Sequence, residues 1–180
     1  MPEEIKTTYI LEMHSREDFR PKGGEISGLR IDRMEKRSPE FNKYLHMLVG
    51  HPHRWGGRSH WTLREWSDFV SDPGVETWVA FFGATPAGYF ELRKEEDGAV
   101  AIVCLGLLPE YVGRGMGGLF LSKAIECAWE MGANRIWLGT CSHDHPRALE
   151  NYKARGFQVS STREGPANPT WLSFWETVTG

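Results

Sequence analysis

The fold is decided by one stretch of sequence, AVAIVCLGLLPEYVGRGMGG, which occupies residues 99–118. An apolar run of strand length ends at Pro109, and a short loop leads from it to a turn dense in glycine. An amphipathic run follows over residues 119–131, and its apolar side chains recur at helical spacing. A strand, a glycine-rich turn and a helix in this order are typical of a diphosphate site. The apolar helix positions are Phe120, Leu121, Ala124, Ile125, Ala128 and Met131.

The glycines have a physical reason to gather at this point. The first N–H groups of a helix lack intrahelical partners, and the helix dipole adds partial positive charge beside them. An anion is attracted to that end, and glycines remove the side chains that would hold it away. Arg114 adds a cation. We therefore predict that a diphosphate binds to the backbone of Gly113, Gly115, Gly117 and Gly118.

Two other kinds of phosphate site fit the sequence less well. Gly113, Gly115 and Gly118 satisfy the dinucleotide spacing G-x-G-x-x-G, which requires a tight turn directly after the strand and an acidic residue about 20 positions on. Here residues 109–112 intervene, and the next predicted strand, residues 135–140, ends without a carboxylate. A nicotinamide site is therefore disfavoured. A Walker-type loop is excluded because no Gly-Lys-Ser/Thr occurs.

Two blocks of the chain resemble the GNAT superfamily of acyl-CoA-dependent N-acyltransferases. The pyrophosphate loop of that family reads Gln/Arg-x-x-Gly-x-Gly/Ala, and residues 112–117 read Val-Gly-Arg-Gly-Met-Gly. Its second block reads Asn-x-x-Ala-x-x-x-Tyr-x-x-x-Gly-Phe, and residues 145–157 read His-Pro-Arg-Ala-Leu-Glu-Asn-Tyr-Lys-Ala-Arg-Gly-Phe. Val112 and His145 depart from the family pattern. Both blocks together are far more specific than either alone.

The resemblance implies one α/β domain over residues 1–180, with a mixed, mostly antiparallel sheet of about seven strands and about four flanking helices. Residues 77–157 are then the acetyl-CoA-binding core, and residues 14–74 form a helical segment on the acceptor side. The implied reaction transfers the acetyl group of acetyl-CoA to a primary amine of a small molecule, by direct attack in a ternary complex. A protein or peptide amine, another acyl-CoA, and a CoA-binding module without turnover are the alternatives.

The resemblance also assigns roles to individual residues. Spacing alone favours Tyr152 as a core residue, but the matching family Tyr lies near the cofactor sulfur, where a hydroxyl can protonate the departing thiolate. Backbone N–H groups of the central strand are candidate oxyanion donors, and Gly106 is expected either to ease a bulge there or simply to pack. The implied cofactor contacts are Leu105, Gly106, Leu107, Val112, Gly113, Arg114, Gly115, Met116, Gly117, Gly118, His145 and Tyr152.

An alkylammonium must lose a proton before it attacks, so the reaction needs a base or a chain of waters. Glu91, on the strand before the central one, is the candidate general base, and Glu110, His143 and His145 are alternatives. Cysteine nucleophiles for a covalent route are Cys104 and Cys141, but no neighbour in the sequence marks either thiol as activated.

Composition and net charge indicate which classes of binding partner are unfavourable. A net charge of −3 and a pI near 6.2 give no broad electrostatic footprint for nucleic acid or an anionic membrane. Neither a signal peptide nor a membrane-length apolar run occurs, and three isolated cysteines favour a reducing cytoplasm. Many members of the resembled family pair through their sheets, so a homodimer is allowed.

The histidine and tryptophan clusters give only weak indications of a binding site. His51, His53 and His60, and separately Cys141, His143 and His145, lack the spacing of established metal sites, so no metal is expected. The tryptophans that either line the acceptor site or pack are Trp55, Trp61 and Trp66.

Local signals predict the remaining elements in order. Residues 7–13 are expected to form a first strand at an edge of the sheet, and residues 14–37 give no readable element. Ser38 and Thr62 are expected to cap two helices. Asp144 or His145 is expected to cap a later helix that ends at Gly156. The expected strands after the first are residues 77–82, 87–94 and the apolar run from 99 up to Pro109 in an antiparallel meander, then 135–140 parallel to the central strand, 157–161 and 170–176.

Overall fold

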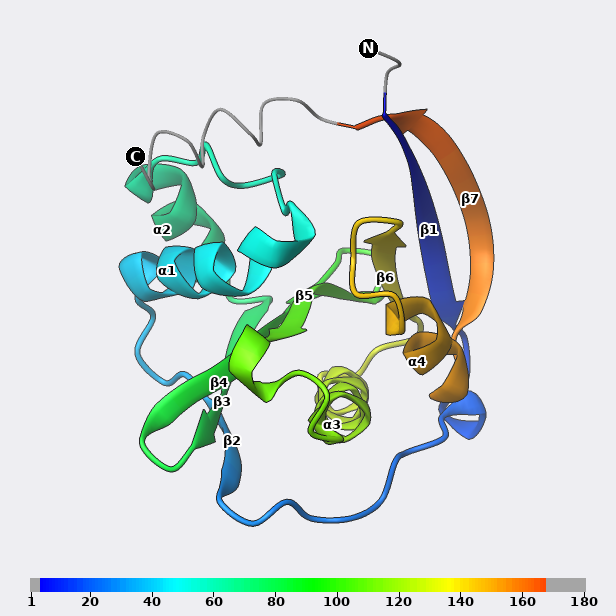
Figure 1. Ribbon diagram of the computed structural model, residues 1–180, viewed down its shortest axis with the longest axis horizontal. Coiled ribbons are helices and arrows are strands. Elements are labelled where there is room, and N and C mark those ends of the chain that lie inside the picture. The colour runs from blue at the N-terminus through cyan, green and yellow to red at the C-terminus, as the bar shows by residue number, and fades with distance from the viewer. Residues whose placement is uncertain (1–3, 168–180) are drawn as a thin grey trace.

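The computed structural model describes residues 4–167, which form a seven-stranded sheet with helices on both faces (Figure 1). The strands are β1 (Ile5–Met13), β2 (Leu29–Arg33), β3 (Val75–Phe82), β4 (Thr85–Lys94), β5 (Val100–Leu107), β6 (Ile136–Cys141) and β7 (Gln158–Pro166). The helices are α1 (Pro39–Gly50), α2 (Leu63–Ser71), α3 (Met116–Glu130) and α4 (Ala148–Ala154).

The strand order is β2-β3-β4-β5-β6-β1-β7, and every neighbouring pair is antiparallel except β5 with β6. The crossover through α3 makes that pair parallel, as predicted. The predicted mixed, mostly antiparallel sheet of seven strands with four helices is therefore confirmed for the described part of the chain.

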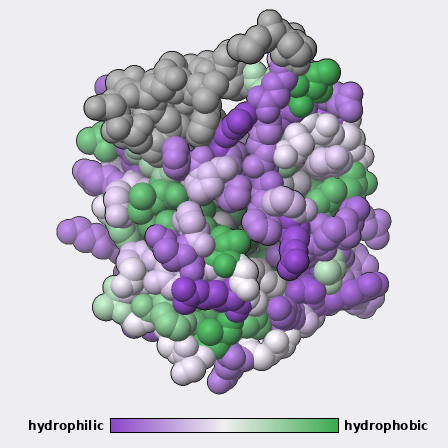
Figure 2. Space-filling model, in the orientation of Figure 1, coloured by the Kyte–Doolittle hydropathy of each residue, from purple (hydrophilic) through white to green (hydrophobic). Residues whose placement is uncertain are grey.

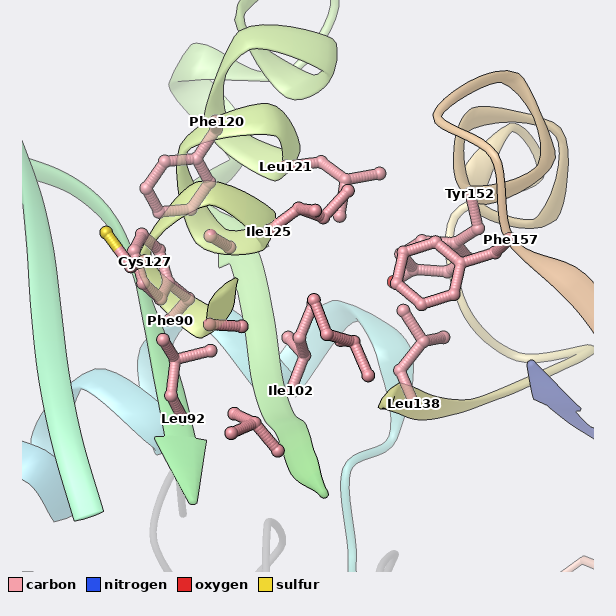
Figure 3. Packing of buried hydrophobic residues seen from close by; sticks show 14 of the residues in the cluster. Phe90, Leu92, Ile102, Phe120, Leu121, Ile125, Cys127, Leu138, Tyr152 and Phe157 are labelled. Carbon is pink, nitrogen blue, oxygen red and sulfur yellow. The ribbon is translucent and has the colours of Figure 1, made fainter. Parts of the chain in front are cut away.

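A separate apolar core lies on each face of the sheet. On one face α3 packs through Phe120 onto Phe90 of β4 (Figure 3). On the other face α1 packs through Leu45 onto Tyr89 and Cys104. Tyr89 and Phe90 are consecutive in β4 and point to opposite sides because of the pleat.

The helix caps predicted for α1 and α2 are confirmed. The Ser38 hydroxyl accepts from the N–H of Phe41, and Thr62 forms a complete capping box with Glu65. The N-cap of α3 is Gly115, and its first helical residue lies three positions before the predicted start at residue 119. The helix therefore begins inside the glycine-rich turn.

The predicted cap of α4 is wrong. Its N-cap is Arg147, which makes no side-chain capping bond. Asp144 instead accepts from the Cys141 N–H and the Thr140 hydroxyl, which closes a turn after β6. The imidazole of His145 accepts from the N–H of Arg147 at 3.2 Å, so both predicted caps stabilise the loop that precedes the helix.

The first strand lies inside the sheet, and the prediction that it forms an edge is wrong. β1 pairs with β6 on one side and with β7 on the other, and Leu11 and Met13 are buried. The chain then crosses beneath α3 to β2 at the opposite edge (Figure 1). The sequence signal for β1 was correct, but its neighbours come from segments more than 120 residues away.

Two strands differ from those predicted from the sequence. β2 lies within residues 14–37, where charged residues, glycines and Pro21 obscured a five-residue strand. β7 extends to Pro166 rather than ending at residue 161. The predicted strand at residues 170–176 lies outside the described residues.

Hydrophilic residues cover most of the face seen in Figure 2, and apolar residues form small groups between them. Among the helices of residues 4–167, each is too short or too polar to cross a bilayer.

Candidate functional site

The site begins where two parallel strands part. β5 and β6 pair only over residues 100–102 and 136–138, although β5 continues to Leu107 and β6 to Cys141. A cavity of about 980 Å³ lies there, lined by residues of both strands. The start of α3, α4 and residues 53–58 complete its wall.

A bulge distorts the central strand next to this point. In the β4–β5 ladder Glu91 pairs with Cys104 and Leu92 pairs with Ile102, so Val103 is the additional residue. The bulge directly follows the last residue of β5 that pairs with β6. Backbone groups of β5 beyond it are therefore not paired with β6 and face the cavity edge.

Gly106 packs and does not form the bulge, so that part of the prediction is wrong. A Cβ added to Gly106 would lie 2.4 Å from Cγ1 of Val49, which shows that α1 approaches β5 closely here. Leu105, Gly106 and Leu107 nevertheless all line the cavity, where the sequence analysis expected ligand contacts.

The glycine-rich turn presents its backbone to the cavity. Gly113 and Gly115 have φ values of +82° and +79°, and a Cβ on either residue would meet no atom within 4 Å. At Gly117 the nearest atom to such a Cβ is Nδ2 of Asn151 at 3.9 Å. These residues, with Val112 and Gly118, line the cavity. The open space that side chains would fill fits a diphosphate held by backbone N–H groups.

Two predicted cofactor contacts lie elsewhere. The Arg114 guanidinium lies 5.5 Å from the ring centroid of Tyr111 and outside the cavity wall. Met116 is buried in the core beneath α3. The structure brings His145 to the wall, but neither Arg114 nor Met116.

A cation that the sequence analysis missed lies beside the turn. Lys22, from the segment between β1 and β2, donates through Nζ to the carbonyl of Gly115 at 3.1 Å. Its backbone N–H donates to the Ser122 hydroxyl at 2.8 Å, which fixes this segment against α3. Lys22 lines the cavity, about 90 residues from the turn it contacts. No local motif could have indicated this contact.

Tyr152 lines the cavity from α4. Its ring packs edge-on against Phe157, with centroids 6.3 Å apart, and both lie beside Leu138 of β6 (Figure 3). Burial raises the pKa of the Tyr152 hydroxyl, and the nearby Asp144 raises it further. The hydroxyl therefore holds its proton at neutral pH, as a general acid requires.

Glu91 lies behind the wall and not in it. Its side chain is fully buried; Oε1 accepts from Asn42 at 2.7 Å and Oε2 accepts from Arg58 at 2.6 Å. Both carboxylate oxygens are engaged by protein donors, which suits a residue that positions Arg58 better than a general base. Of the alternative bases, His145 lines the cavity, whereas Glu110 and His143 do not.

Arg58 is a cavity-lining residue that the sequence did not single out. Its guanidinium lies 4.0 Å from the ring centroid of Phe69 and 4.9 Å from that of Trp61, and Trp66 lies 5.5 Å away. Trp61 and Trp66 thus pack around this cation, while Trp55 lines the cavity. The spacing of these aromatic residues, at intervals of three to five positions after Arg58, was a readable signal.

A buried polar cluster adjoins Arg58 on the acceptor side. His46 Nδ1 lies 3.1 Å from the Tyr89 hydroxyl and 3.6 Å from Sγ of Cys104. Burial and the charge of Arg58 together lower the pKa of His46 to about 3, so its imidazole is neutral. Burial raises the pKa of Cys104 to about 12, and that of Cys141 also rises. Neither thiol is ionised at neutral pH, so neither is an activated nucleophile.

Within residues 4–167, His, Cys, Asp and Glu side chains form no group of three that could hold a metal ion. Among its other lining groups, the cavity contains the backbone of the glycine-rich turn, several basic side chains and the protonated Tyr152 hydroxyl. This set suits a large anionic ligand and a transfer reaction at the gap between β5 and β6.

Comparison with known proteins identifies the family. The model of the Acetyltransferase (GNAT) family matches residues 33–157, which include the bulged strand, the glycine-rich turn and Tyr152. The chain therefore belongs to the GNAT acetyltransferase family.

Individual relatives agree with this assignment. An uncharacterized N-acetyltransferase of Mycobacterium tuberculosis (strain H37Rv) is 31% identical over 97 residues, which cover 54% of this chain and 62% of that protein. A protein of the same description from Mycobacterium bovis matches over the same shares. The chain thus spans less than two thirds of the length of these relatives.

Solved structures share the fold. A GCN5-related N-acetyltransferase from Kribbella flavida superposes with a TM-score of 0.64 at 17% identity, over 93% of this chain and 60% of that one. An aminoglycoside acetyltransferase from an uncultured soil metagenomic sample, solved with sisomicin, gives a TM-score of 0.58 at 14% identity, over 71% of this chain and 87% of that one. At these identities the likeness concerns the fold alone.

Proposed function

We propose that this protein transfers the acetyl group of acetyl-CoA to the primary amine of a small molecule, by direct attack in a ternary complex. One observation carries the proposal: a single cavity contains both the exposed backbone at the start of α3 and the Tyr152 side chain. The first is suited to the diphosphate of the donor and the second to its departing sulfur.

The donor half of the cavity fits acetyl-CoA. Its diphosphate would lie on the N–H groups of residues 113–118, where the open space at Gly113, Gly115 and Gly117 accepts phosphate oxygens. Lys22 and Arg147 line the same wall and supply positive charge. The thioester would reach the gap between β5 and β6, beyond the bulge at Val103.

The reacting groups follow from this placement. Residues 105–107 line the cavity and also pair with β4, so those of their backbone N–H groups that do not bond to β4 can stabilise the oxyanion that forms when an amine adds to the thioester. Tyr152 then gives its proton to the departing thiolate. The amine loses its proton to water, because Glu91 is engaged by Asn42 and Arg58.

The test is thiol release from acetyl-CoA in the presence of a panel of primary amines, with Tyr152→Phe as the matched variant. Phe keeps the ring contact with Phe157 and removes only the hydroxyl. We expect kcat to fall by roughly a hundredfold or more, as for loss of a general acid, with unchanged acetyl-CoA affinity. A variant with full turnover would remove Tyr152 from the mechanism. Saturable acetyl-CoA binding without turnover of any amine would favour a binding module.

A further inference from the structure

The acceptor side of the cavity contains a rigidly held cation. Arg58 is 89% buried at its side chain, Glu91 accepts from its Nη1, and Phe69 lies against the guanidinium plane. Asn42 in turn donates to Glu91 and so fixes the carboxylate. An arginine held in this way has lost most of its conformational freedom before any ligand arrives.

Glu91 accepts a hydrogen bond from only one of the N–H donors of the guanidinium. A guanidinium has five N–H donors, and the bond from Nη1 to Glu91 is its one hydrogen bond to residues 4–167. Arg58 lines the cavity, so the remaining donors are available to a ligand there. Such a fork of donors matches a carboxylate, which can accept two of them in parallel.

The surrounding charges favour an anionic group. Basic side chains that line the cavity are Lys6, Lys22, Arg54, Arg58 and Arg147, whereas its acidic side chains are Asp144 and Glu150. Asp144 accepts from the Trp55 indole, the Thr140 hydroxyl and the Cys141 N–H. A polycationic acceptor would therefore meet the like charge of Arg58 itself and no uncommitted carboxylate from Asp144.

Arg58 also lies close to the expected reaction point. Glu91, which accepts from Arg58, pairs in the β4–β5 ladder with Cys104, the residue directly after the bulge. Cys104 and Tyr152 both line the cavity that Arg58 lines. A ligand bound to Arg58 therefore shares this cavity with Tyr152.

We infer that the acceptor is an amino carboxylate, whose carboxylate binds Arg58 while its amine, a few bonds away, attacks the thioester carbon. This inference rests on the proposed function. In the reaction the nitrogen–carbonyl bond forms and the carbon–sulfur bond breaks. The amine releases one proton to water, and Tyr152 supplies one to the sulfur and is later reprotonated by solvent, so the products are the N-acetyl amino carboxylate and the CoA thiol.

The test compares each standard amino acid with its own amide, which keeps the amine and side chain but lacks the negative charge. Thiol release from acetyl-CoA is measured as kcat/KM, corrected for the fraction of unprotonated amine. We expect at least one amino acid to exceed its amide by about tenfold or more, as for loss of a hydrogen bond to a charged group. Saturable acetyl-CoA binding with no amino acid turned over, or with amides turned over equally well, would overturn the inference and leave the proposed function standing. Absence of acetyl-CoA binding would instead contradict the proposed function.

A double variant assigns the preference to Arg58. Arg58→Gln combined with Glu91→Gln removes both charges without leaving either one buried alone. The ratio of amino acid to amide should fall to about one. The matched control, Arg33→Gln with Glu76→Gln, removes an ion pair of 2.9 Å between β2 and β3, away from the cavity, and should keep the ratio. If the double variant does not bind acetyl-CoA, Arg58→Lys serves in its place; an unchanged ratio in the folded variant would contradict the assignment.

Discussion

Lys22 shows how a single residue from a distant segment completes the donor site. Its Nζ lies at the Gly115 carbonyl, beside the helix end that attracts phosphate. We predict that Lys22→Met weakens acetyl-CoA binding roughly three- to tenfold, a modest effect because the side chain is exposed. The backbone N–H still donates to Ser122, so the segment keeps its place.

The control for this prediction is Lys36→Met, at an exposed lysine outside the cavity wall. The affinity difference should shrink as salt is added, because it is electrostatic. Equal affinities of the two variants in calorimetry at low salt would show that Lys22 does not contact the donor.

His46 links the buried cluster to acid stability. Its pKa of about 3 in the folded protein lies below the ordinary 6.5, so below pH 6.5 the unfolded chain binds a proton that the folded protein does not. The folded state therefore loses stability as pH falls from about 6.5 towards 3, and is unaffected by this residue above that window.

The corresponding variant is His46→Gln, which cannot be protonated. Between pH 7 and pH 5 the wild type should lose about 2 kcal/mol more of its free energy of unfolding than this variant. Urea unfolding at the two pH values measures the difference. Identical losses would mean that His46 is not buried in its neutral form.

At the scale of elements, the start of α3 combines a backbone requirement with an opening for a ligand. We predict that Gly113→Ala costs roughly 1–2 kcal/mol of stability, because φ is +82° there, and also abolishes or strongly weakens acetyl-CoA binding. Gly83→Ala is the matched control, since Gly83 has φ +62° and equally open space in the turn between β3 and β4. It should show a similar thermal destabilisation with normal binding. Loss of binding in both variants would assign the effect to stability alone.

Local signals predicted most elements because their causes are local. The Ser38 cap, the Thr62 capping box and the turn before α3 each depend on residues within a few positions. The predicted cap of α4 was wrong for a related reason, because Asp144 accepts hydrogen bonds from Thr140 and Cys141 instead of capping the helix. A short side chain that can bond to two nearby segments cannot be assigned from spacing.

At the scale of the whole molecule, β1 joins the two ends of the described chain into one sheet. It pairs with β6 and β7, and the Ala167 N–H donates to the Glu4 carbonyl at 2.8 Å. Leu11→Ala should cost about 3 kcal/mol in urea unfolding, because Leu11 is fully buried between these strands and the core. Val159→Ala, on edge strand β7 and 39% exposed, should cost far less. Similar small losses would indicate that β1 is not an interior strand.

The two halves of the site differ in how far the sequence could predict them. The donor half lies in residues 105–118 and α4, and most of its predicted residues do line the cavity. The acceptor half joins three separate segments, which are α1 with His46, the segment before α2 with Arg58, and β4 with Tyr89 and Glu91. Lys22 joins the donor half from a fourth segment. Their assembly depends on long-range packing, so Glu91 could be singled out but not given its partner.

A calorimetric titration of the protein with acetyl-CoA tests directly whether the cavity binds this donor, with NAD as a parallel control and Gly117→Leu as the blocked variant. Gly117 has open space and no positive φ, so the added side chain fills the cavity without straining the backbone. We predict saturable binding of acetyl-CoA, no binding of NAD, and loss of acetyl-CoA binding in Gly117→Leu. Binding of NAD in place of acetyl-CoA, or acetyl-CoA binding that Gly117→Leu leaves unchanged, would contradict this prediction.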